Sequence, residues 1–481
     1  MTRPNGISTN YTYDSLSRLL SVLHQSGTTT LDGAIYTVDN AGNRTSKADQ
    51  LAGVTSNFTY DSIYELTGVT QGTNTTESYS YDPVGNRTAS LGVASYTTNA
   101  SNEMTANSNA SFTYDDDGNT ASKTDSTGTT NYSWDYENRL TSVTLPGSSG
   151  TVSFKYDPFG RRIYKSSSSA TSIFAYDGDN LVEEANSSGS AVARYSQGLN
   201  IDEPLAMLRS SSTSYYNADG LGSITSLGNA AGTLAQTYTF DSFGKQTASS
   251  GSLVNPFQFT GREFDSETGL YFLRARYFDS QAGRFLSEDP IGFSGGDINV
   301  YRYSFNDPVN LEDPSGLTVT CTYNQSLGTL RCTDDSTGAV VVNTRGYSGG
   351  NEGACPACVN NPFTQSKPFA GPIPTGYWTM SKCFTGTSAH GKPMPETIRL
   401  SPTIFTSPAG SWRSPGFLIH GGYQNGSRTA SNGCIVIGRP ERHAICQAGG
   451  GTMNVISGLP VTGPSVPFVP LLGKPEPFGF Q

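Results

Sequence analysis

The sequence predicts an all-β protein made of repeated β-hairpins followed by a second, separate β-domain. Gly (54) and Pro (26) together form about a sixth of the 481 residues, more than in ordinary chains, which indicates frequent turns. Tyr (26) and Phe (23), with abundant Ser and Thr, favour short strands and exclude a helical bundle. An aromatic or apolar residue followed by Asp recurs in the first part of the chain, mostly at intervals of about 20 to 25 residues.

The recurring residue pair defines a repeat unit. The pairs are Tyr13-Asp14, Val38-Asp39, Tyr60-Asp61, Tyr81-Asp82, Tyr114-Asp115, Trp134-Asp135, Tyr156-Asp157, Tyr176-Asp177 and Phe240-Asp241. We expect the Asp to cap a turn, a following Gly to supply positive φ, and the aromatic ring to pack against the neighbouring unit. One hairpin cannot bury its own face, so the units must stack. A plain β-solenoid or unrelated strands are the alternatives, and one carboxylate per unit is too few for a metal site.

Charge and cysteine divide the chain near residue 317. The whole chain carries 30 Lys and Arg and 40 Asp and Glu; residues 318–481 hold 11 and 6 of these, which leaves 19 and 34 for residues 1–317. The first part therefore has a net charge of −15 and the second of +5, and all seven cysteines lie in the second. No apolar stretch reaches the roughly 20 residues of a membrane span, and the N-terminus lacks a signal-peptide core.

Residues 269–317 carry the most specific pattern of the first part. They read GLYFLRARYFD at 269–279, GRFLSEDPIG at 283–292 and DPSGL at 313–317. Together with the repeats, these motifs resemble the YD repeats and associated core of Rhs proteins, a family that includes polymorphic toxins, toxin-complex C subunits and teneurins. The resemblance implies that residues 1–245 spiral into a hollow β-cage around a C-terminal toxin and that a core at 246–317 cuts the chain. Only about nine units precede the core, which suggests a truncated cage.

The same resemblance implies which residues make the cut. Asp289 and Asp313 would form an intramolecular aspartyl-protease pair, and Arg276 would assist them. The scissile bond would join Leu317 to Thr318. Two close carboxylates can share a proton, so that one activates water while the other polarises the carbonyl group. Both Asp-Pro-x-Gly motifs could instead be simple turns, but the change of composition directly after Leu317 favours cleavage.

The seven cysteines of the second part predict three disulfides and one free thiol, and hence an oxidising compartment such as a periplasm. A zinc site at Cys355 and Cys358 would need two further ligands, and a redox dithiol would need a thioredoxin-like setting. We therefore expect disulfides there, and neither a metal nor an organic cofactor. The cysteines are Cys321, Cys332, Cys355, Cys358, Cys383, Cys434 and Cys446.

A candidate nucleophile lies between two apolar runs. The first run ends at His420, a Gly-rich loop follows, and Ser431, Gly433 and Cys434 precede the second run. Cys434 and His420 on adjacent strand ends would come within hydrogen-bonding reach, as an activated thiolate requires. Backbone N–H groups near Gly433 could hold an oxyanion. The alternatives are a bridged or core cysteine and an ordinary histidine.

These motifs resemble the L,D-transpeptidase (YkuD-like) pattern, and residues 318–459 as a whole resemble Tlde1-type effectors that act on peptidoglycan. The resemblance implies that Cys434, deprotonated by His420, attacks the diaminopimelate carbonyl of a tetrapeptide stem and releases D-Ala. Hydrolysis would give L,D-carboxypeptidase activity, and a D-amino acid acceptor would give exchange.

Two further residues have implied roles in that domain. Ser431 would orient the loop, and Arg439 would bind a stem carboxylate, although a surface ion pair is an equal alternative. Common L,D-transpeptidases carry His where this chain has Asn432, so His420 has to serve as the base. The Pro-rich residues 460–481 are expected to form a tail.

The predicted function is that of an interbacterial toxin. It would be secreted, with a type VI apparatus as the expected route, would act on peptidoglycan in the target-cell periplasm, and would be neutralised by a cognate immunity protein. We expect no nucleic-acid partner and no membrane insertion. Two alternatives stay open: a surface adhesion or carbohydrate-binding protein that displays a β-domain, and an Rhs toxin with a nuclease cargo. The second part lacks an HNH-like or His/Asp metal cluster, which makes the nuclease the least favoured.

Overall fold

The computed structural model describes residues 1–14, 18–40, 42–198, 202–290, 292 and 297–316, and beyond them the strands between residues 319 and 456. Regular structure in these residues is almost entirely β, joined by short 3-10 turns such as η1 (Phe259–Gly261) and η3 (Ser304–Asn306). The all-β class is thereby confirmed. Among the helices of this part of the chain, none has the length and apolar character of a membrane span.

Residues 7–251 form two long sheets, and within each sheet every strand pairs antiparallel with the next, as expected for stacked hairpins. The first sheet contains β1 (Ile7–Tyr13), β2 (Leu19–Ser26), β3 (Thr29–Val38), β4 (Arg44–Asp49), β5 (Val54–Tyr60), β6 (Leu66–Gln71), β7 (Asn74–Tyr81) and β8 (Arg87–Ser90). The second contains β9 (Tyr96–Thr98), β10 (Met104–Asn107), β11 (Ala110–Tyr114), β12 (Thr120–Asp125), β13 (Gly128–Trp134), β14 (Leu140–Thr144), β15 (Thr151–Tyr156), β16 (Arg162–Ser166), β17 (Thr171–Asp177), β18 (Asn180–Ala185), β19 (Ala191–Gln197), β20 (Pro204–Arg209), β21 (Ser212–Ala218), β22 (Ile224–Gly228), β23 (Leu234–Phe240) and β24 (Gln246–Gly251). We call β1–β24 the ribbon.

Two smaller sheets follow the ribbon. Four short antiparallel strands lie in what we call the core segment, residues 255–316: β25 (Glu263–Asp265), β26 (Leu270–Leu273), β27 (Arg276–Asp279) and β28 (Arg284–Phe285). The last sheet contains ten strands in the order β31-β30-β29-β38-β33-β35-β36-β37-β32, with β34 paired to β35. Its strands are β29 (Val319–Asn324), β30 (Thr329–Thr333), β31 (Val340–Arg345), β32 (Tyr347–Ser348), β33 (Gly376–Met380), β34 (Phe384–Thr387), β35 (Pro393–Phe405), β36 (Phe417–His420), β37 (Ile435–Val436) and β38 (Gly451–Ile456).

The recurring Asp residues cap the turns of the ribbon, as predicted. In each unit, Asp Oδ1 accepts a hydrogen bond from the backbone amide four residues later, at 2.9–3.0 Å. The exception is Tyr176-Asp177, where Asp177 is paired with Asn180 across a two-residue turn, so the residue four positions later, Leu181, already lies in the paired strand. The capping residues are Asp14, Asp39, Asp61, Asp82, Asp115, Asp135, Asp157 and Asp241.

In six of the nine predicted units, the recurring aromatic residue links the unit to the previous one. Tyr81 donates its hydroxyl hydrogen bond to the Leu66 carbonyl at 2.9 Å, and Tyr176 donates to the Arg162 carbonyl at 2.8 Å. The ring is partly buried while its polar end satisfies a backbone carbonyl, which a phenol or indole can do and a Phe cannot. The same bond is made by Tyr60, Tyr114, Trp134 and Tyr156.

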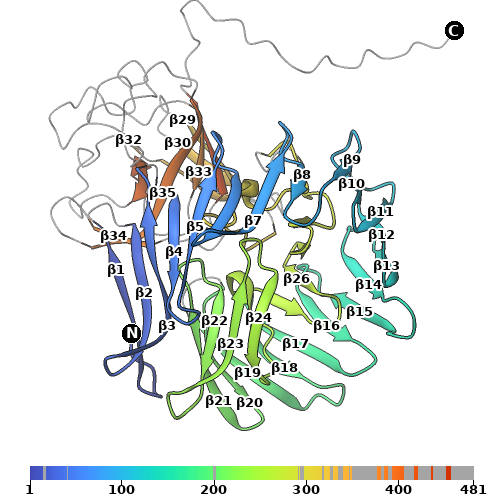
Figure 1. The fold of residues 1–481 in the computed structure, drawn as a ribbon, viewed down its shortest axis with the longest axis horizontal. Coiled ribbons are helices and arrows are strands. Elements are labelled where there is room, and N and C mark those ends of the chain that lie inside the picture. Colours follow the sequence, from blue (N-terminus) through green and yellow to red (C-terminus); the bar gives the residue numbers. More distant parts are fainter. Residues whose placement is uncertain are drawn as a thin grey trace, which may run out of the picture.

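The beginning of the ribbon packs across strands near its end, and we call this overlap the seam. Figure 1 shows the ribbon curving from β1 (blue) through β14 (teal) to β21 and β22 (green), which lie beside β3. Side chains rather than strand pairing join the two ends here. The imidazole of His24 lies 2.9 Å from the Ala218 carbonyl, and Asp32 accepts hydrogen bonds from Thr225 and Ser226 at 2.6 and 2.5 Å. The ribbon therefore completes one turn.

The core segment lies inside this turn, where Figure 1 shows β26 in yellow, and it provides the hydrophobic core. Alternation along β26 and β27 directs side chains to two faces. Tyr271 and Phe278 pack with ribbon residues of β6 and β7, whereas Phe272 and Tyr277 pack with those of β14 and β15. Its first part reaches a third region, because Phe257 packs against β17–β23. One short segment thus packs against three separate regions of the ribbon, β6–β7, β14–β15 and β17–β23.

Candidate functional site

Arg276 is the centre of the site. It is the first residue of β27, and only 2% of its side chain is exposed. Its Nη2 atom lies 2.9 Å from Asp289 Oδ2 and 3.3 Å from Asp313 Oδ2. Its Nη1 atom donates to the Val300 carbonyl at 3.0 Å, and the guanidinium carbon lies 3.6 Å from the centroid of the Phe285 ring. The structure thus brings together three residues that the sequence analysis assigned to the cut.

Electrostatics explain why these three charged groups can share a buried place. A guanidinium taken out of water without a partner costs several kcal/mol, so the two carboxylates offset the burial of Arg276. One cation faces two carboxylates, so a single proton shared by the pair would balance the charges. Burial, with the negative charges of Glu312 and Asp313, raises the pKa of the neighbouring Tyr303, whose hydroxyl stays protonated.

The residues before the predicted cut are held against β27. Arg276 Nε donates to the Gly316 carbonyl at 2.5 Å, and the Ala275 amide donates to the Ser315 carbonyl at 3.0 Å. Gly316 has a φ of +68°, and a Cβ atom there would lie 2.2 Å from the Leu273 carbonyl oxygen. Only Gly fits this position without movement of the backbone.

The turn interpretation of the two Asp-Pro motifs also has a basis in the structure. The Gly292 amide donates to the Asp289 carbonyl at 2.8 Å, so Asp289 does begin a turn. The Ser315 hydroxyl donates to Asp313 at 3.3 Å. These turns aim both carboxylates at Arg276, so the two interpretations are compatible. Leu317 and Thr318 lie outside the described residues.

The second predicted site is described only through its strands. His420 ends β36, and β37 begins with the residue after Cys434. The two strands are parallel neighbours, with His420 in register with Val436. The predicted contact between thiol and imidazole stays a prediction, because four of its residues lie outside the described part: Ser431, Gly433, Cys434 and Arg439.

One pair of cysteines has a defined backbone position. β29 and β30 pair antiparallel with Cys321 directly opposite Cys332. Opposed residues on antiparallel strands have Cα separations of about 4.5 or 5.5 Å, and a disulfide spans about 4.4 to 6.8 Å. The register is therefore compatible with a disulfide between these two residues, and the pairing stays a prediction.

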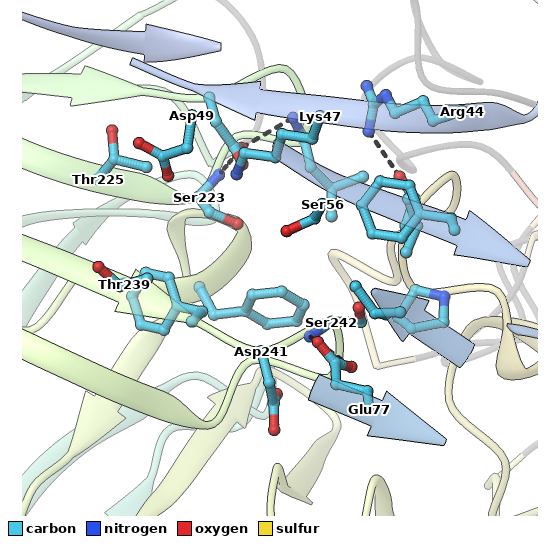
Figure 2. Close-up of a pocket in the computed structure, with 18 of the residues that line it drawn as sticks. Arg44, Lys47, Asp49, Ser56, Glu77, Ser223, Thr225, Thr239, Asp241 and Ser242 are labelled. Carbon is cyan, nitrogen blue, oxygen red and sulfur yellow. Dashed lines mark hydrogen bonds and ion pairs between the residues drawn. The ribbon is translucent and has the colours of Figure 1, made fainter. Parts of the chain in front are cut away.

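A cavity of about 100 Å³ lies at the seam, between the first hairpins and the last (Figure 2). On one side Lys47 donates to Asp219 at 2.7 Å, and on the other Glu77 accepts from the Ser242 amide at 3.1 Å. Burial and the negative charge of Glu77 raise the pKa of Asp241 to about 7. Within the described residues, no group of three His, Cys, Asp or Glu side chains could hold a metal ion. These polar contacts join the two ends of the ribbon.

Comparison with known proteins identifies the family. Residues 50–309, more than half of the chain, match the model of the teneurin YD-shell. The chain belongs to the teneurin YD-shell family. The resemblance of the repeats to YD repeats, and of the core segment to the Rhs-associated core, is consistent with this membership.

Two relatives and one solved structure show what this chain is similar to. The chain is 32% identical over 263 residues to the tRNA3(Ser)-specific nuclease WapA of Bacillus spizizenii, covering 51% of this chain and 11% of WapA. It is 34% identical over 105 residues to toxin protein Tse5 of Pseudomonas aeruginosa, covering 22% of this chain and 8% of Tse5. These matches span about a tenth of each relative. The Tc holotoxin pore of Photorhabdus luminescens has a similar fold, with a TM-score of 0.54 at 20% identity, covering 66% of this chain and 18% of that chain.

Sequence reasoning missed several residues around the site. Asn99 and Asp219 cap turns in the same way as the predicted Asp residues, but neither follows an aromatic residue. Arg274 and Asp202 contact each other next to the site, at 2.7 Å. The Leu-Arg-Ala-Arg motif predicted a role for Arg276 and not for Arg274. Asp202 lies in a turn of the ribbon, and no local sequence pattern indicates its role.

Proposed function

We propose that this YD-shell protein hydrolyses its own chain between Leu317 and Thr318 and thereby frees residues 318–481 as a toxin domain. One observation carries the proposal. A single guanidinium, that of Arg276, contacts both Asp289 and Asp313 while it binds the carbonyl of the residue before Leu317. Simple turns do not require that two motifs 24 residues apart converge on one buried cation.

The chemistry follows from this arrangement. One carboxylate of the pair removes a proton from water, whose oxygen attacks the Leu317 carbonyl carbon, while the protonated carboxyl group of the other donates a hydrogen bond to the carbonyl oxygen. When the tetrahedral intermediate collapses, the C–N bond breaks and the nitrogen of Thr318 receives a proton. The products are a carboxylate at Leu317 and an amine at Thr318. Arg276 orients both carboxylates and the preceding peptide.

Intact mass and denaturing gels test this proposal directly. Wild-type protein is expected as two fragments that together account for the 51.1 kDa chain plus one water molecule. Asp289→Asn and Asp313→Asn are each expected to leave a single intact chain, because neither variant retains the carboxylate pair. Asp297→Asn, a substitution of a carboxylate that binds Arg302 instead, is the matched control and is expected to be cleaved. An intact wild-type chain would reject self-cleavage.

We further propose that the freed part is a cysteine enzyme acting on tetrapeptide stems of peptidoglycan. The Cys434 and His420 motifs and the resemblance to Tlde1-type effectors support it, and the adjacent strands β36 and β37 are compatible with it. Cys434 would be acylated by the stem with loss of D-Ala, and water or a D-amino acid would then release the stem. The protein would be secreted, act in the periplasm of a target cell and be bound there by an immunity protein.

Release of D-Ala from tetrapeptide muropeptides tests the proposed enzyme. Self-cleaved wild-type protein is expected to release D-Ala, and Cys434→Ala is expected to release none. Cys446→Ala is the control for loss of a cysteine as such, because it removes a cysteine that is expected to be in a disulfide and not the expected free thiol, and it should still release D-Ala. Equal behaviour of wild type and Cys434→Ala would reject the enzyme without affecting self-cleavage.

A nuclease cargo is the second candidate, and one observation favours it: the relative WapA is a tRNA-specific nuclease. Incubation of the self-cleaved protein with total tRNA separates the two candidates. Loss of intact tRNA, unaffected by Cys434→Ala, would favour the nuclease.

A further inference from the structure

Arg274 lies beside the proposed cleavage site, where it contacts both the ribbon and the peptide that precedes the cut. It is the first of the two residues between β26 and β27, with a φ of +55° that non-Gly residues seldom adopt. Its guanidinium binds both carboxylate oxygens of Asp202, at 2.7 and 3.0 Å. The same guanidinium donates to the Pro314 carbonyl. Arg274 therefore connects a turn of the ribbon with the peptide that precedes the proposed cut.

Three consecutive carbonyls of that peptide are bound by three consecutive residues. Pro314 accepts from the Arg274 side chain, as described above. The next two carbonyls, of Ser315 and Gly316, accept from the Ala275 amide and the Arg276 side chain. A shift of the peptide by one residue would break all three hydrogen bonds, so together they fix its register. The Gly316 carbonyl belongs to the peptide bond between Gly316 and Leu317, and the peptide bond after it is the proposed scissile bond.

Asp202 is itself fixed in place. Its side chain is 3% exposed and accepts a second charged hydrogen bond, from Arg262 at 2.5 Å. A Cβ atom at Gly261 would lie 2.6 Å from the Asp202 carbonyl oxygen, so the core segment and this turn of the ribbon are in close contact. Bidentate pairs between guanidinium and carboxylate define orientation as well as distance. The position of Arg274 is thus set by the ribbon and not only by its own short hairpin.

We propose that Arg274, oriented by Asp202, is a positioning residue that determines which peptide bond is presented to Asp289 and Asp313. The proposal rests on the proposed self-cleavage. A bond held about 1 Å from its productive place can react about 100-fold more slowly. Loss of Arg274 frees the Pro314 carbonyl and leaves two of the three hydrogen bonds, so the peptide can take more than one position.

The test measures both the rate and the place of cleavage in the full chain. Radiolabelled protein is made by cell-free translation, and the intact chain is followed with time while mass spectrometry identifies the new C-terminus. Arg274→Gln is expected to slow cleavage by about 10- to 100-fold and to produce fragments that do not end at Leu317. Arg274→Lys, which keeps one donor and the charge, is expected to recover part of the rate.

Lys165→Gln is the matched control. Lys165 is as buried as Arg274, with 17% of its side chain exposed against 18%, and it too joins the ribbon to carboxylates of the core segment. Its amino group contacts Asp265 and Glu267, at 3.1 Å each. We expect Lys165→Gln to lower the midpoint of thermal unfolding but to be cleaved at Leu317 at the wild-type rate.

The outcomes separate this proposal from the one on which it rests. Wild-type speed and a single end at Leu317 in Arg274→Gln would overturn the positioning role. So would equal slowing in Lys165→Gln, since that would point to general stability. If Arg274→Gln gives no folded chain, Asp202→Asn takes its place, because it keeps Arg274 but weakens its orientation, and the same loss of accuracy is expected. Failure of self-cleavage itself would instead show as an intact wild-type chain.

Discussion

The ribbon and the core segment are stabilised in different ways. In the ribbon, the same few hydrogen bonds recur in most of the repeat units, between an Asp and its own turn and between a Tyr or Trp and the previous unit. The core segment instead forms ion pairs with residues more than a hundred positions away, as Glu263 and Asp265 do with Arg162 of the ribbon. The comparison teaches that loss of one ribbon contact affects one unit, whereas loss of one core contact affects the whole turn.

The largest effect is expected where a core ion pair is broken. Arg162→Gln leaves the buried carboxylate of Glu263 without this cation and that of Asp265 with Lys165 alone, and it should lower the free energy of unfolding by about 3 to 5 kcal/mol. Denaturant unfolding measures it. Arg161→Gln, at the next residue, removes a partly exposed pair with Asp157 and should change stability by less than about 1 kcal/mol. Equal losses in the two variants would contradict the difference drawn here.

Loss of a seam contact should lower the free energy of unfolding less than loss of a core ion pair and more than loss of a single repeat contact. Asp32→Ala removes the acceptor for Thr225 and Ser226, and we expect the free energy of unfolding to fall by about 2 to 3 kcal/mol, since these are buried hydrogen bonds to a charged group. Asp125→Ala, in a turn away from the seam, is the control and should lose about 1 kcal/mol. If the seam contributed nothing to stability, the two variants would lose the same free energy of unfolding.

Single repeat contacts should each contribute little and add independently. Tyr81→Phe, Tyr114→Phe and Tyr176→Phe each remove one hydroxyl bond to a backbone carbonyl, and each should lose about 1 kcal/mol. The combined variants should lose the sum to within about 0.5 kcal/mol, because the sites are well separated. Denaturant unfolding of single and double variants measures this. Strong coupling would mean that the repeats do not act as separate units.

The smallest effect is expected from the pH dependence of the last repeat. Burial and the charge of Glu77 raise the pKa of Asp241 to about 7, above its value in the unfolded chain. The folded chain therefore holds more protons between about pH 4 and 7, so this residue's contribution to stability is present below that window and is lost as the pH rises through 7. Asp241→Asn should raise stability by up to about 1 kcal/mol at pH 8 and have little effect at pH 4.

Asp157→Asn provides the opposite sign as a control. Burial raises the pKa of Asp157, but hydrogen bonds from Arg161 outweigh it and lower the pKa below the usual value. The stability from Asp157 is then present above the unfolded-state pKa and is lost as the pH falls. Thermal unfolding at pH 4 and pH 8 compares the two variants. A loss at pH 8 in both would contradict the assignment for Asp241.

The repeating part of the fold could be predicted from the sequence because its contacts are local. Asp82, Gly85 and Asn86 lie within one turn, so composition and spacing define it. The convergence of Asp289 and Asp313 on Arg276 was proposed by resemblance and not by spacing, since no local rule brings them together. Asp202 and the seam could not be predicted, because their partners lie at remote positions and the sequence gives no sign of where the ribbon closes.

The seam makes the number of hairpins a fixed property of the protein. His24 and Asp32 meet partners in β21 and β22, and those partners arrive only after a set count of repeats. Deleting or inserting one hairpin between β3 and β21 would move β21 and β22 away from His24 and Asp32 and break these contacts, although the hairpins resemble one another. A change in the number of repeats would thus remove stabilising contacts at the seam, far from the repeat that was added or lost. The contacts that β2 and β3 make there set the number of hairpins in the turn.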